Sequence, residues 1–207
     1  MRSFELARKM EDGKPVTFST DRCQVDAYEL AYPQAQLPEY QTSRSAGADF
    51  FCAEEVTIPS IWVGVAEALL AKGEELFVRL LPSNTDDNAK RLAKRLQPTL
   101  IHTGIKASME PDEVLEIYNR SSNPKKLGLV LANGVGVIDS DYYENVDNDG
   151  EIMFAFYNFM PWSVTIKVGD RIGQGVFKKY LRPEVGLRVK DVERVGGIGS
   201  TDNSEGK

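Results

Sequence analysis

A polar segment between residues 119 and 143 (NRSSNPKKLGLVLANGVGVIDSDYY) holds the side chains best suited to chemistry. Its first four residues combine an arginine and two serines after a strand-like run, and such guanidinium, hydroxyl and amide groups bind phosphate. A later strand-like run ends at Asp139, and Asp141 and Tyr142 follow. Asp139 and Asp141 point to one side of a strand, where a carboxylate can act as general base. Considered alone, an aspartate-rich turn is more often a solvated hairpin end than a site.

Two glycine-containing segments strengthen the interpretation as a phosphate site. The segment GDRIGQG at residues 169–175 places Arg171 and Gln174 around the start of a strand, which supplies a forked cation and an amide. The segment GGIGST at residues 196–201 can wrap backbone N–H groups around a phosphate. Each segment alone is better explained as a hairpin turn or a chain end. The three segments together predict binding of a polyphosphate, with a carboxylate available as general base.

Many short strands separated by turns are expected to position these residues. Helical periodicity interrupts the strand pattern at about residues 60–98, which we expect to be a helical insertion. Residues 1–24 are predicted to form a peripheral N-terminal arm with a short helix, and residues 194–207 a flexible C-terminal lid. The pattern predicts one domain, 1–207, with an all-β fold of the jelly-roll type. Strand-like runs cover residues 28–32, 50–58, 114–118, 127–131, 136–138, 152–157, 164–168 and 172–177.

Length and composition exclude several classes of protein. The 207 residues carry 25 Lys and Arg against 31 Asp and Glu, so the net charge is −6, which argues against nonspecific binding of nucleic acid. Hydrophobic residues make up 42% of the chain, which rules out wholesale disorder, and no apolar run approaches the ~18–20 residues of a membrane span. Cys23 and Cys52 form no CxxC pair, and the single histidine, His102, excludes a mechanism that needs two imidazoles. We therefore expect a cytoplasmic protein with no membrane or specific nucleic-acid partner.

Five segments of the chain resemble, in order, the five sequence motifs of the trimeric dUTPase family. The resemblance runs from about Tyr28 to Thr201 apart from the insertion, and five matches in the family's order are a strong indication where one would be weak. It implies a jelly-roll-like (β-clip) subunit in a homotrimer whose active sites are shared between chains. It also implies hydrolysis of dUTP to dUMP and pyrophosphate with Mg²⁺, which controls the dUTP level and supplies dUMP. The segments are SAGADFFCAEEVTIP (45–59), NRSS (119–122), NGVGVIDSDYY (133–143), GDRIGQG (169–175) and GGIGST (196–201).

The resemblance implies roles for single residues around the reacting phosphate, the sugar and the base. Asp139 would be the general base that activates water for attack on the α-phosphorus. Tyr142 would stack on the deoxyribose and exclude a 2′-hydroxyl, and Asn133 with the hairpin backbone at Gly136 would bind the uracil edge. Asp49 would hold waters around a Mg²⁺ bound to the phosphates. A carboxylate base also explains how the site works without histidine.

Most of the other implied contacts are made to the triphosphate. Arg171 would pair near Asp139 and the triphosphate, and Gln174 would contact a phosphate. The tail would close over the nucleotide as a lid, with its hydroxyls at the γ-phosphate. In the turn after the strand-like run at residues 114–118, Ser121 would contact the phosphate chain near the scissile bond and Arg120 would support the turn, and Ser122 is also an implied substrate contact. In the lid, Ser200 and Thr201 would lie at the γ-phosphate, and Ile198 with Gly199 would cover the base.

The chain departs from the family pattern in three places, and the first is the lid arginine, whose usual position is occupied by Glu193 with Arg194 one residue later. Ile198 stands where the lid usually carries an aromatic residue, which removes a stacking contribution of roughly 0.5–1.5 kcal/mol. Tyr143 and Glu144 replace the usual Arg-Gly pair. From Asp139 to Glu151 the chain has six acidic residues and no basic one, which predicts that cations are attracted into the site or a subunit interface.

Two other functions fit the sequence less well than dUTP hydrolysis. A dCTP deaminase resembles dUTPases in fold, but its catalytic glutamate would fall at Ala155, so we reject deamination. A nucleotide-gated regulatory protein would use the insertion at residues 60–98 to contact a protein partner, although charged helices more often only face solvent. Outside the motifs, His102 is predicted to end a strand, and Trp62 and Trp162 to be packing residues. A compact chain with an insertion suits a bacterium or a bacteriophage, with the host cytoplasm as its location in the second case.

Overall fold

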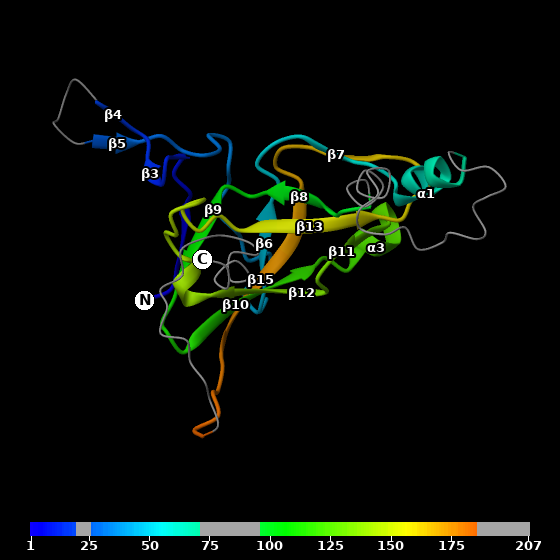
Figure 1. The fold of residues 1–207 in the computed structure, drawn as a ribbon. Coiled ribbons are helices and arrows are strands. Elements are labelled where there is room, and N and C mark those ends of the chain that lie inside the picture. Colours follow the sequence, from blue (N-terminus) through cyan, green and yellow to red (C-terminus); the bar gives the residue numbers. More distant parts are fainter. Residues whose placement is uncertain (20–25, 71–95, 186–207) are drawn as a thin grey trace.

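The computed structural model describes residues 1–19, 26–70 and 96–185, and within them short antiparallel strands dominate, as the sequence predicts (Figure 1). The helices are α1 (Ile61–Leu70), α3 (Ser122–Leu127) and the 3-10 helix η2 (Ser140–Tyr142). The strands are β1 (Ser3–Leu6), β2 (Met10–Glu11), β3 (Lys14–Pro15), β4 (Thr17–Ser19), β5 (Asp26–Tyr28), β6 (Ala48–Phe51), β7 (Val56–Ile58), β8 (Thr99–His102), β9 (Ile105–Ser108), β10 (Glu113–Asn119), β11 (Leu129–Leu131), β12 (Val135–Asp139), β13 (Met153–Asn158), β14 (Val164–Ile166) and β15 (Arg171–Lys179).

The largest sheet has four strands in the order β12-β10-β15-β6, with β12 at one edge. Its side chains alternate between two faces because successive residues of a strand point in opposite directions. Phe50, Leu115 and Ile117 point into the core and are at most 2% exposed. Val137 and Asp139 of the edge strand β12 point to the opposite, solvent-facing side. Gln174 lies on the same outer face, since it is paired through Tyr118 with Val135.

A second sheet, β11-β13-β8, encloses the core together with the pairs β1-β9 and β14-β7. Phe154 and Phe156 of β13 are buried, and so is Ile101 of β8. The ring centroids of Phe154 and Phe50 lie 5.6 Å apart, so aromatic packing joins this sheet to the four-stranded one. The hydrophobic core therefore lies between facing strands that are far apart in the sequence.

The N-terminal segment differs from the peripheral arm with a short helix that the sequence predicts. β1 pairs with β9 over four residue pairs, from Ser3 with Ser108 to Leu6 with Ile105. The ring of Phe4 meets Phe50 edge-on at 5.4 Å between centroids. The apolar residues of this segment alternate with polar ones, which is the period of a strand and not of a helix. Two small hairpins, β2-β3 and β4-β5, follow and lie at one end of the molecule (Figure 1).

Two further segments differ in detail from the predicted elements. The run at residues 50–58 forms two strands, β6 and β7, which belong to different sheets. Residues 122–127 form α3 where the sequence predicts a turn, because Pro124 is tolerated in the first helical turn and Gly128 ends the helix with a left-handed φ of 62°. The insertion begins with α1 as predicted, but residues 71–95, including its second predicted helix, lie outside the described residues.

Trp62 and Trp162, which were predicted to be packing residues, lie largely at the surface. They are 51% and 63% exposed, and the indole N–H of Trp62 donates to the carbonyl oxygen of Phe159 at 3.1 Å. This hydrogen bond holds Trp62 at the surface, where its polar N–H has a partner. Across the part of the chain that the structure describes, none of the helices has the length and apolar character needed to cross a membrane.

Candidate functional site

Asp49, Arg171 and Gln174 form a polar cluster between β6 and β15. Gln174 donates to one carboxylate oxygen of Asp49 at 2.8 Å, and Arg171 donates to the other at 3.0 Å. The side chain of Asp49 is 2% exposed, whereas that of Arg171 is 41% exposed. A register shift between Arg171 and Gly173 interrupts the pairing of β15 with β6, and such bulges re-aim side chains. Asp49 thus holds a cation and an amide beside one another at the surface.

The turn after β10 lies directly against this cluster. The guanidinium group of Arg120 donates to the carbonyl oxygen of Arg171 at 3.0 Å. Asn123, which is 2% exposed, donates to the carbonyl oxygen of Ile172 at 2.8 Å and to the side chain of Asn119. The structure therefore brings the turn at residues 120–122, with its arginine and two serines, to the start of β15. Asn123 was missed by the sequence reasoning, although it directly follows those serines.

The hairpin between β11 and β12 reaches the same end of the four-stranded sheet. Its turn holds Asn133 near the surface, and Gly134 has a left-handed φ of 68°. A Cβ at Gly136 would lie only 2.4 Å from Cγ1 of Ile117, so only glycine lets β12 approach β10 here. The hairpin is in register with the polar cluster. Val135 is paired with Tyr118 of β10, and Tyr118 is paired on its other side with Gln174 of β15. The hairpin and the Gln174 cluster thus lie at the same end of the sheet.

Asp139 lies at the opposite end of the same sheet. It is paired with Val114, and Val114 is paired with Lys178 on β15. Because strands rise about 3.3 Å per residue and lie about 4.8 Å apart, this register places Asp139 about 16 Å from Gln174 between Cα atoms. The predicted pairing of Arg171 near Asp139 therefore does not occur within one chain, where Arg171 pairs with Asp49.

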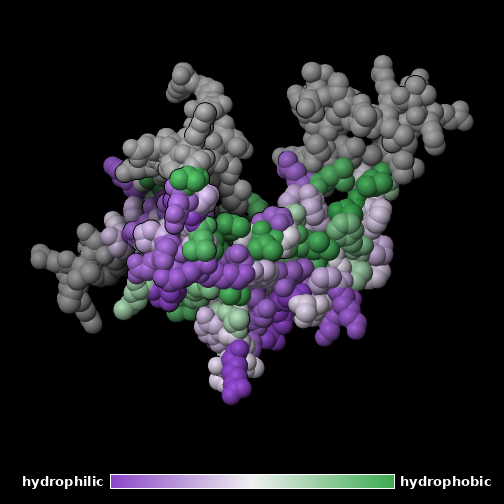
Figure 2. All heavy atoms as spheres, turned by 90° about the horizontal axis from the view of Figure 1, so that it is seen from below, coloured by the Kyte–Doolittle hydropathy of each residue, from purple (hydrophilic) through white to green (hydrophobic). Residues whose placement is uncertain are grey.

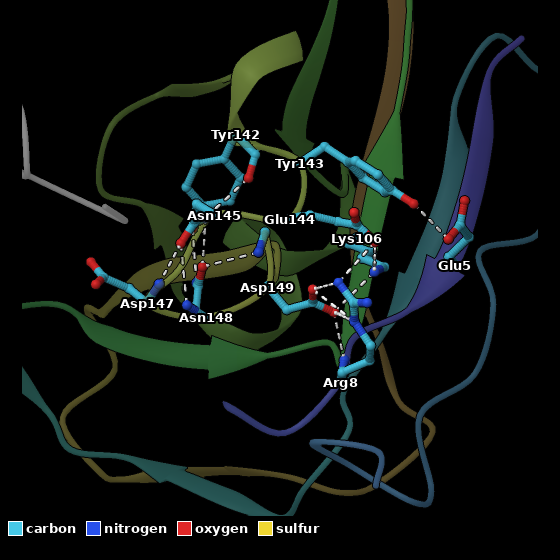
Figure 3. A network of polar contacts seen from close by, with 11 residues as sticks. Glu5, Arg8, Lys106, Tyr142, Tyr143, Glu144, Asn145, Asp147, Asn148 and Asp149 are labelled. Atoms are coloured by element: carbon cyan, nitrogen blue, oxygen red, sulfur yellow. Dashed lines mark hydrogen bonds and ion pairs between the residues drawn. The ribbon is translucent and has the colours of Figure 1, made fainter. Parts of the chain in front are cut away.

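Tyr142 follows Asp139 in η2 and is 5% exposed. Its hydroxyl donates to the carbonyl oxygen of Glu151 at 3.0 Å and accepts from the side-chain amide of Asn148 at 2.9 Å. Both partners of this hydroxyl belong to the loop that returns from Tyr142 to β13, part of which Figure 3 shows beside Tyr142. Asn148 was also missed, since nothing in its sequence position points to the tyrosine.

Cations from distant segments offset much of the acidic run between Asp139 and Glu151. Arg8 and Lys106 both contact Asp149, and the pKa of Asp149 is lowered, since burial opposes ionisation but hydrogen bonds from Arg8 and Lys106 outweigh it. The sequence predicts that the acidic run attracts cations into the site or a subunit interface. For Asp149 this prediction is corrected, because its cationic partners are Arg8 and Lys106 of the same chain. Within the described ranges, no group of three or more His, Cys, Asp or Glu could hold a metal ion.

His102 ends β8 as the sequence predicts. Its Nδ1 lies 3.1 Å from a carboxylate oxygen of Glu151, and this hydrogen bond raises the pKa of the imidazole, which burial partly opposes. The ring stacks on Tyr32 with 5.0 Å between centroids, so its role is structural. The lid residues Ile198, Gly199, Ser200 and Thr201 lie outside the described residues, so their predicted contacts stay predictions.

The described residues thus form two separate partial sites on one chain. The first, which we call the anion-binding half, consists of Asp49, Arg171, Gln174 and the turn at residues 120–122, and its guanidinium, amide and hydroxyl groups suit a polyphosphate. The Asp139 half contains the exposed residue Asp139, whose carboxylate suits base catalysis, and beside it the largely buried Tyr142. Neither half combines a base with phosphate ligands, since the carboxylate of the first half, Asp49, is already paired with the cation Arg171.

Comparisons with known proteins give a consistent result. The family model described as dUTPase matches residues 83–202. A deoxyuridine 5'-triphosphate nucleotidohydrolase of Lactococcus lactis is 51% identical over 165 residues, which cover 80% of this chain and 87% of that protein. The crystal structure of a dUTPase from Streptococcus mutans matches with a TM-score of 0.57 and 29% identity, over 88% of this chain and 98% of that chain. A mutant dUTPase from phage phi11 of Staphylococcus aureus, described with a structural Mg(II) ion, shares the fold at a TM-score of 0.51 and 18% identity, over 78% and 94% of the two chains.

Proposed function

Because this chain belongs to the dUTPase family, we propose that its two partial sites are halves of dUTP-hydrolysing sites completed between neighbouring chains. The enzyme is a dUTP diphosphatase, which hydrolyses dUTP to dUMP. The observation that carries the shared-site proposal is the separation of about 16 Å between Asp139 and Gln174 on one sheet, obtained from strand spacings. A single nucleotide cannot have its α-phosphate at Asp139 and its phosphate chain at Gln174 in that arrangement unless a second chain supplies one half.

The outer face of the four-stranded sheet supports assembly of the chain as a homotrimer. Val135 and Val137 of the edge strand β12 are 39% and 60% exposed, next to Asp139 on the same face. The underside of the molecule, where β10 and β12 lie in Figure 1, exposes hydrophobic side chains among hydrophilic ones (Figure 2). Exposed apolar residues on an edge strand are a liability unless another surface covers them. A neighbouring subunit that covers this face would also bring its own anion-binding half to Asp139.

In the proposed mechanism Asp139 accepts a proton from the water that attacks the α-phosphorus, and pyrophosphate leaves. Hydrolysis of a phosphoanhydride depends mainly on positioning and charge neutralisation, so one carboxylate base is sufficient. Arg171 and Gln174, held by Asp49, bind the phosphate chain together with the turn at residues 120–122. This turn supplies Arg120, Ser121 and Ser122.

The remaining proposed contacts select the nucleoside and close the site. Asn133 and the backbone at Gly136 bind the uracil edge, and the Tyr142 ring packs on the deoxyribose. Gly136 suits this role because its lack of a side chain brings the hairpin close to β10. The lid is proposed to cover the nucleotide through Ile198 and Gly199 and to reach the γ-phosphate through Ser200 and Thr201.

dUTPases generally use a divalent metal ion, and we propose Mg²⁺ bound chiefly by the substrate's triphosphate and by water. Mg²⁺ retains several waters and prefers phosphate and carboxylate oxygens, which fits described residues that include no cluster of three metal ligands. Asp49 is the proposed contact to the ion's waters, although both of its oxygens already accept hydrogen bonds from Arg171 and Gln174. When bound, the ion supplies charge neutralisation at the phosphates.

Mixing two inactive variants tests whether the site is shared. Asp139→Asn and Arg171→Met should each release pyrophosphate from dUTP far more slowly than wild type. If the halves come from different chains, unfolding the two variants together and refolding them at equal amounts should restore about a quarter of wild-type activity, because half of the chains are intact at each position. The matched control mixes the double variant with inactive Asp139→Asn and should stay inactive. Failure of the first mixture to regain activity, with trimers present by light scattering, would overturn the shared-site proposal.

The alternatives receive less support than hydrolysis. The position of the deaminase glutamate is Ala155 of β13, which supplies no proton-transferring group. No observation on the described residues favours the nucleotide-gated regulator, and the partner it requires would contact an insertion that is described only to Leu70 and from residue 96. The substrate belongs to the nucleotide pool, so we propose that the enzyme acts in the cytoplasm.

A further inference from the structure

A buried ion-pair cluster joins the N-terminal segment to the loop that follows Asp139 (Figure 3). The carboxylate of Asp149 is 0% exposed and accepts from the backbone N–H of Arg8 at 2.8 Å and from its Nε at 3.0 Å. Nζ of Lys106, which is 3% exposed, lies 3.0 Å from the same carboxylate. Because the carboxylate and the ammonium group are both shielded from water, each depends on its partners, and removing one leaves another unpaired.

Glu144 adds a second carboxylate to this cluster. Nζ of Lys106 lies 2.9 Å from a carboxylate oxygen of Glu144, and Nη2 of Arg8 lies 2.8 Å from it. The backbone of Glu144 has a φ of 56°, a left-handed conformation that residues other than glycine seldom adopt. The two cations hold the side chain of Glu144 against β9 and the N-terminal segment while its backbone turns. Such a conformation persists only where the surroundings over-determine it.

The loop at residues 144–149, which these ion pairs hold in place, contacts both the backbone carbonyl and the phenol hydroxyl of Tyr142. The backbone N–H of Glu144 donates to the carbonyl oxygen of Asp149 at 3.2 Å, and that of Asp149 donates to the carbonyl oxygen of Asn145 at 3.0 Å. The side chain of Asn145 in turn donates to the carbonyl oxygen of Tyr142 at 3.0 Å. At the far end, Asn148 donates to the phenol hydroxyl at 2.9 Å. A displacement of Asp149 is therefore transmitted to the backbone and to the ring of Tyr142.

A neighbouring tyrosine makes a third connection between the same segments. The hydroxyl of Tyr143 donates to the carboxylate of Glu5 on β1 at 2.8 Å. Nζ of Lys106 lies 4.9 Å from the centroid of the Tyr143 ring. Tyr143 and Glu144 are also the residues at which the chain departs from the family's usual Arg-Gly pair. Their side-chain contacts described above all run toward the N-terminal segment and β9.

We propose that Arg8 and Lys106 are positioning residues that set the orientation of Tyr142, and thereby the preference of this enzyme for deoxyribose over ribose. The inference rests on the proposed function, in which the Tyr142 ring packs on the sugar. Arg8 and Lys106 act through Asp149 and Glu144 and not by touching the substrate. The N-terminal segment thereby becomes part of the specificity machinery. Small displacements of a group that packs on a substrate are enough to change rates strongly.

Arg8→Met tests the proposal against a matched control, Arg2→Met. Arg2 lies just before β1 and Arg8 lies just after it. Arg2 pairs with the buried carboxylate of Glu113, so replacing Arg2 also removes a cation from a buried carboxylate. It makes no described contact with the loop at residues 143–151. We expect Arg8→Met to raise the ratio of kcat/KM for UTP to that for dUTP by about tenfold, whereas Arg2→Met lowers stability and leaves the ratio unchanged. Assays are run at a temperature where circular dichroism shows all variants folded.

Two further measurements distinguish positioning from general loss of structure. Arg8→Lys keeps a cation near Asp149 and should restore part of the wild-type ratio. Hydrogen exchange should show faster exchange at the amides of Glu144 and Asp149 in Arg8→Met, but not in Arg2→Met. An unchanged ratio with unchanged exchange would overturn the proposal while leaving dUTP hydrolysis intact. A wild-type protein with no activity on dUTP would instead reject the proposed function, and the exchange experiment would still report whether Arg8 holds the loop.

Discussion

At the scale of single residues, the pair formed by His102 and Glu151 connects pH to the loop behind Tyr142. The carboxylate of Glu151 accepts from the His102 ring and from the backbone N–H of Gly104, and its carbonyl oxygen accepts from the Tyr142 hydroxyl. The hydrogen bond to Glu151 raises the pKa of His102 in the folded protein. The folded protein therefore binds the imidazole proton more tightly than the unfolded chain does.

This linkage predicts a loss of stability as the pH rises. A raised pKa in the folded state contributes stability that is complete below the unfolded pKa of about 6.5 and disappears as the pH rises through the folded pKa. We expect the urea midpoint of wild type to fall relative to that of His102→Gln between about pH 6 and about pH 8. Parallel curves for the two proteins over that interval would contradict the assignment.

At the scale of elements, β1 belongs to the core and does not lie at the periphery. Phe4 packs against Phe50 and, at 5.1 Å between ring centroids, against Phe177. The strand also supplies Glu5 to Tyr143. The charge of the first residues suggested an exposed arm, but which residue pairs with β9 depends on a segment about a hundred positions later in the chain. The sequence pattern of the first residues alone therefore cannot predict this pairing.

Phe4→Ala is expected to lower the free energy of unfolding by about 2 kcal/mol, because a partly buried aromatic ring is lost from the core. Phe159→Ala is the matched control, since Phe159 is 46% exposed and its side chain should contribute less than about 0.5 kcal/mol. Urea unfolding of both variants measures the difference. Equal, small losses of stability in the two variants would contradict the assignment of β1 to the core.

At the scale of the whole molecule, the exposed valines of β12 and the separation of the two partial sites are both explained by the proposed neighbouring subunit. Asp139 and Val137 share the outer face of the four-stranded sheet, and the anion-binding cluster of Arg171 and Gln174 lies toward its other end. In the proposed trimer, a subunit that covers the valines would both cover the exposed edge strand and complete a site. Assembly and activity are therefore expected to fail together.

Val137→Lys should prevent assembly and abolish dUTP hydrolysis while the chain stays folded, because a buried unpaired ammonium group is costly in an interface. Val137→Thr keeps the shape of the side chain and should assemble and remain active. Light scattering gives the mass, and circular dichroism reports the fold. A fully active monomer of Val137→Lys would contradict the need for a neighbouring chain.

The sequence by itself determined the strand-rich fold and the identity of the motif residues, because period-two alternation, turn residues and short motifs are local properties. Asp139, Arg171 and Gln174 were predicted as site residues in this way. Helix α3 was missed since its polar sequence also suits a turn, and the partners of the acidic run were missed because Arg8 and Lys106 are remote in sequence.

Only the tertiary structure decided which of these residues meet. Strand order and register place Asp49 beside Arg171 and Gln174, and they place Asp139 at the opposite end of the same sheet. Register is set by long-range packing of one strand on another, and a shift of one residue would reverse every side chain. The motifs therefore indicate which residue types are available for chemistry. The pairing of distant strands determines that the candidate base and the candidate phosphate ligands of one chain lie apart.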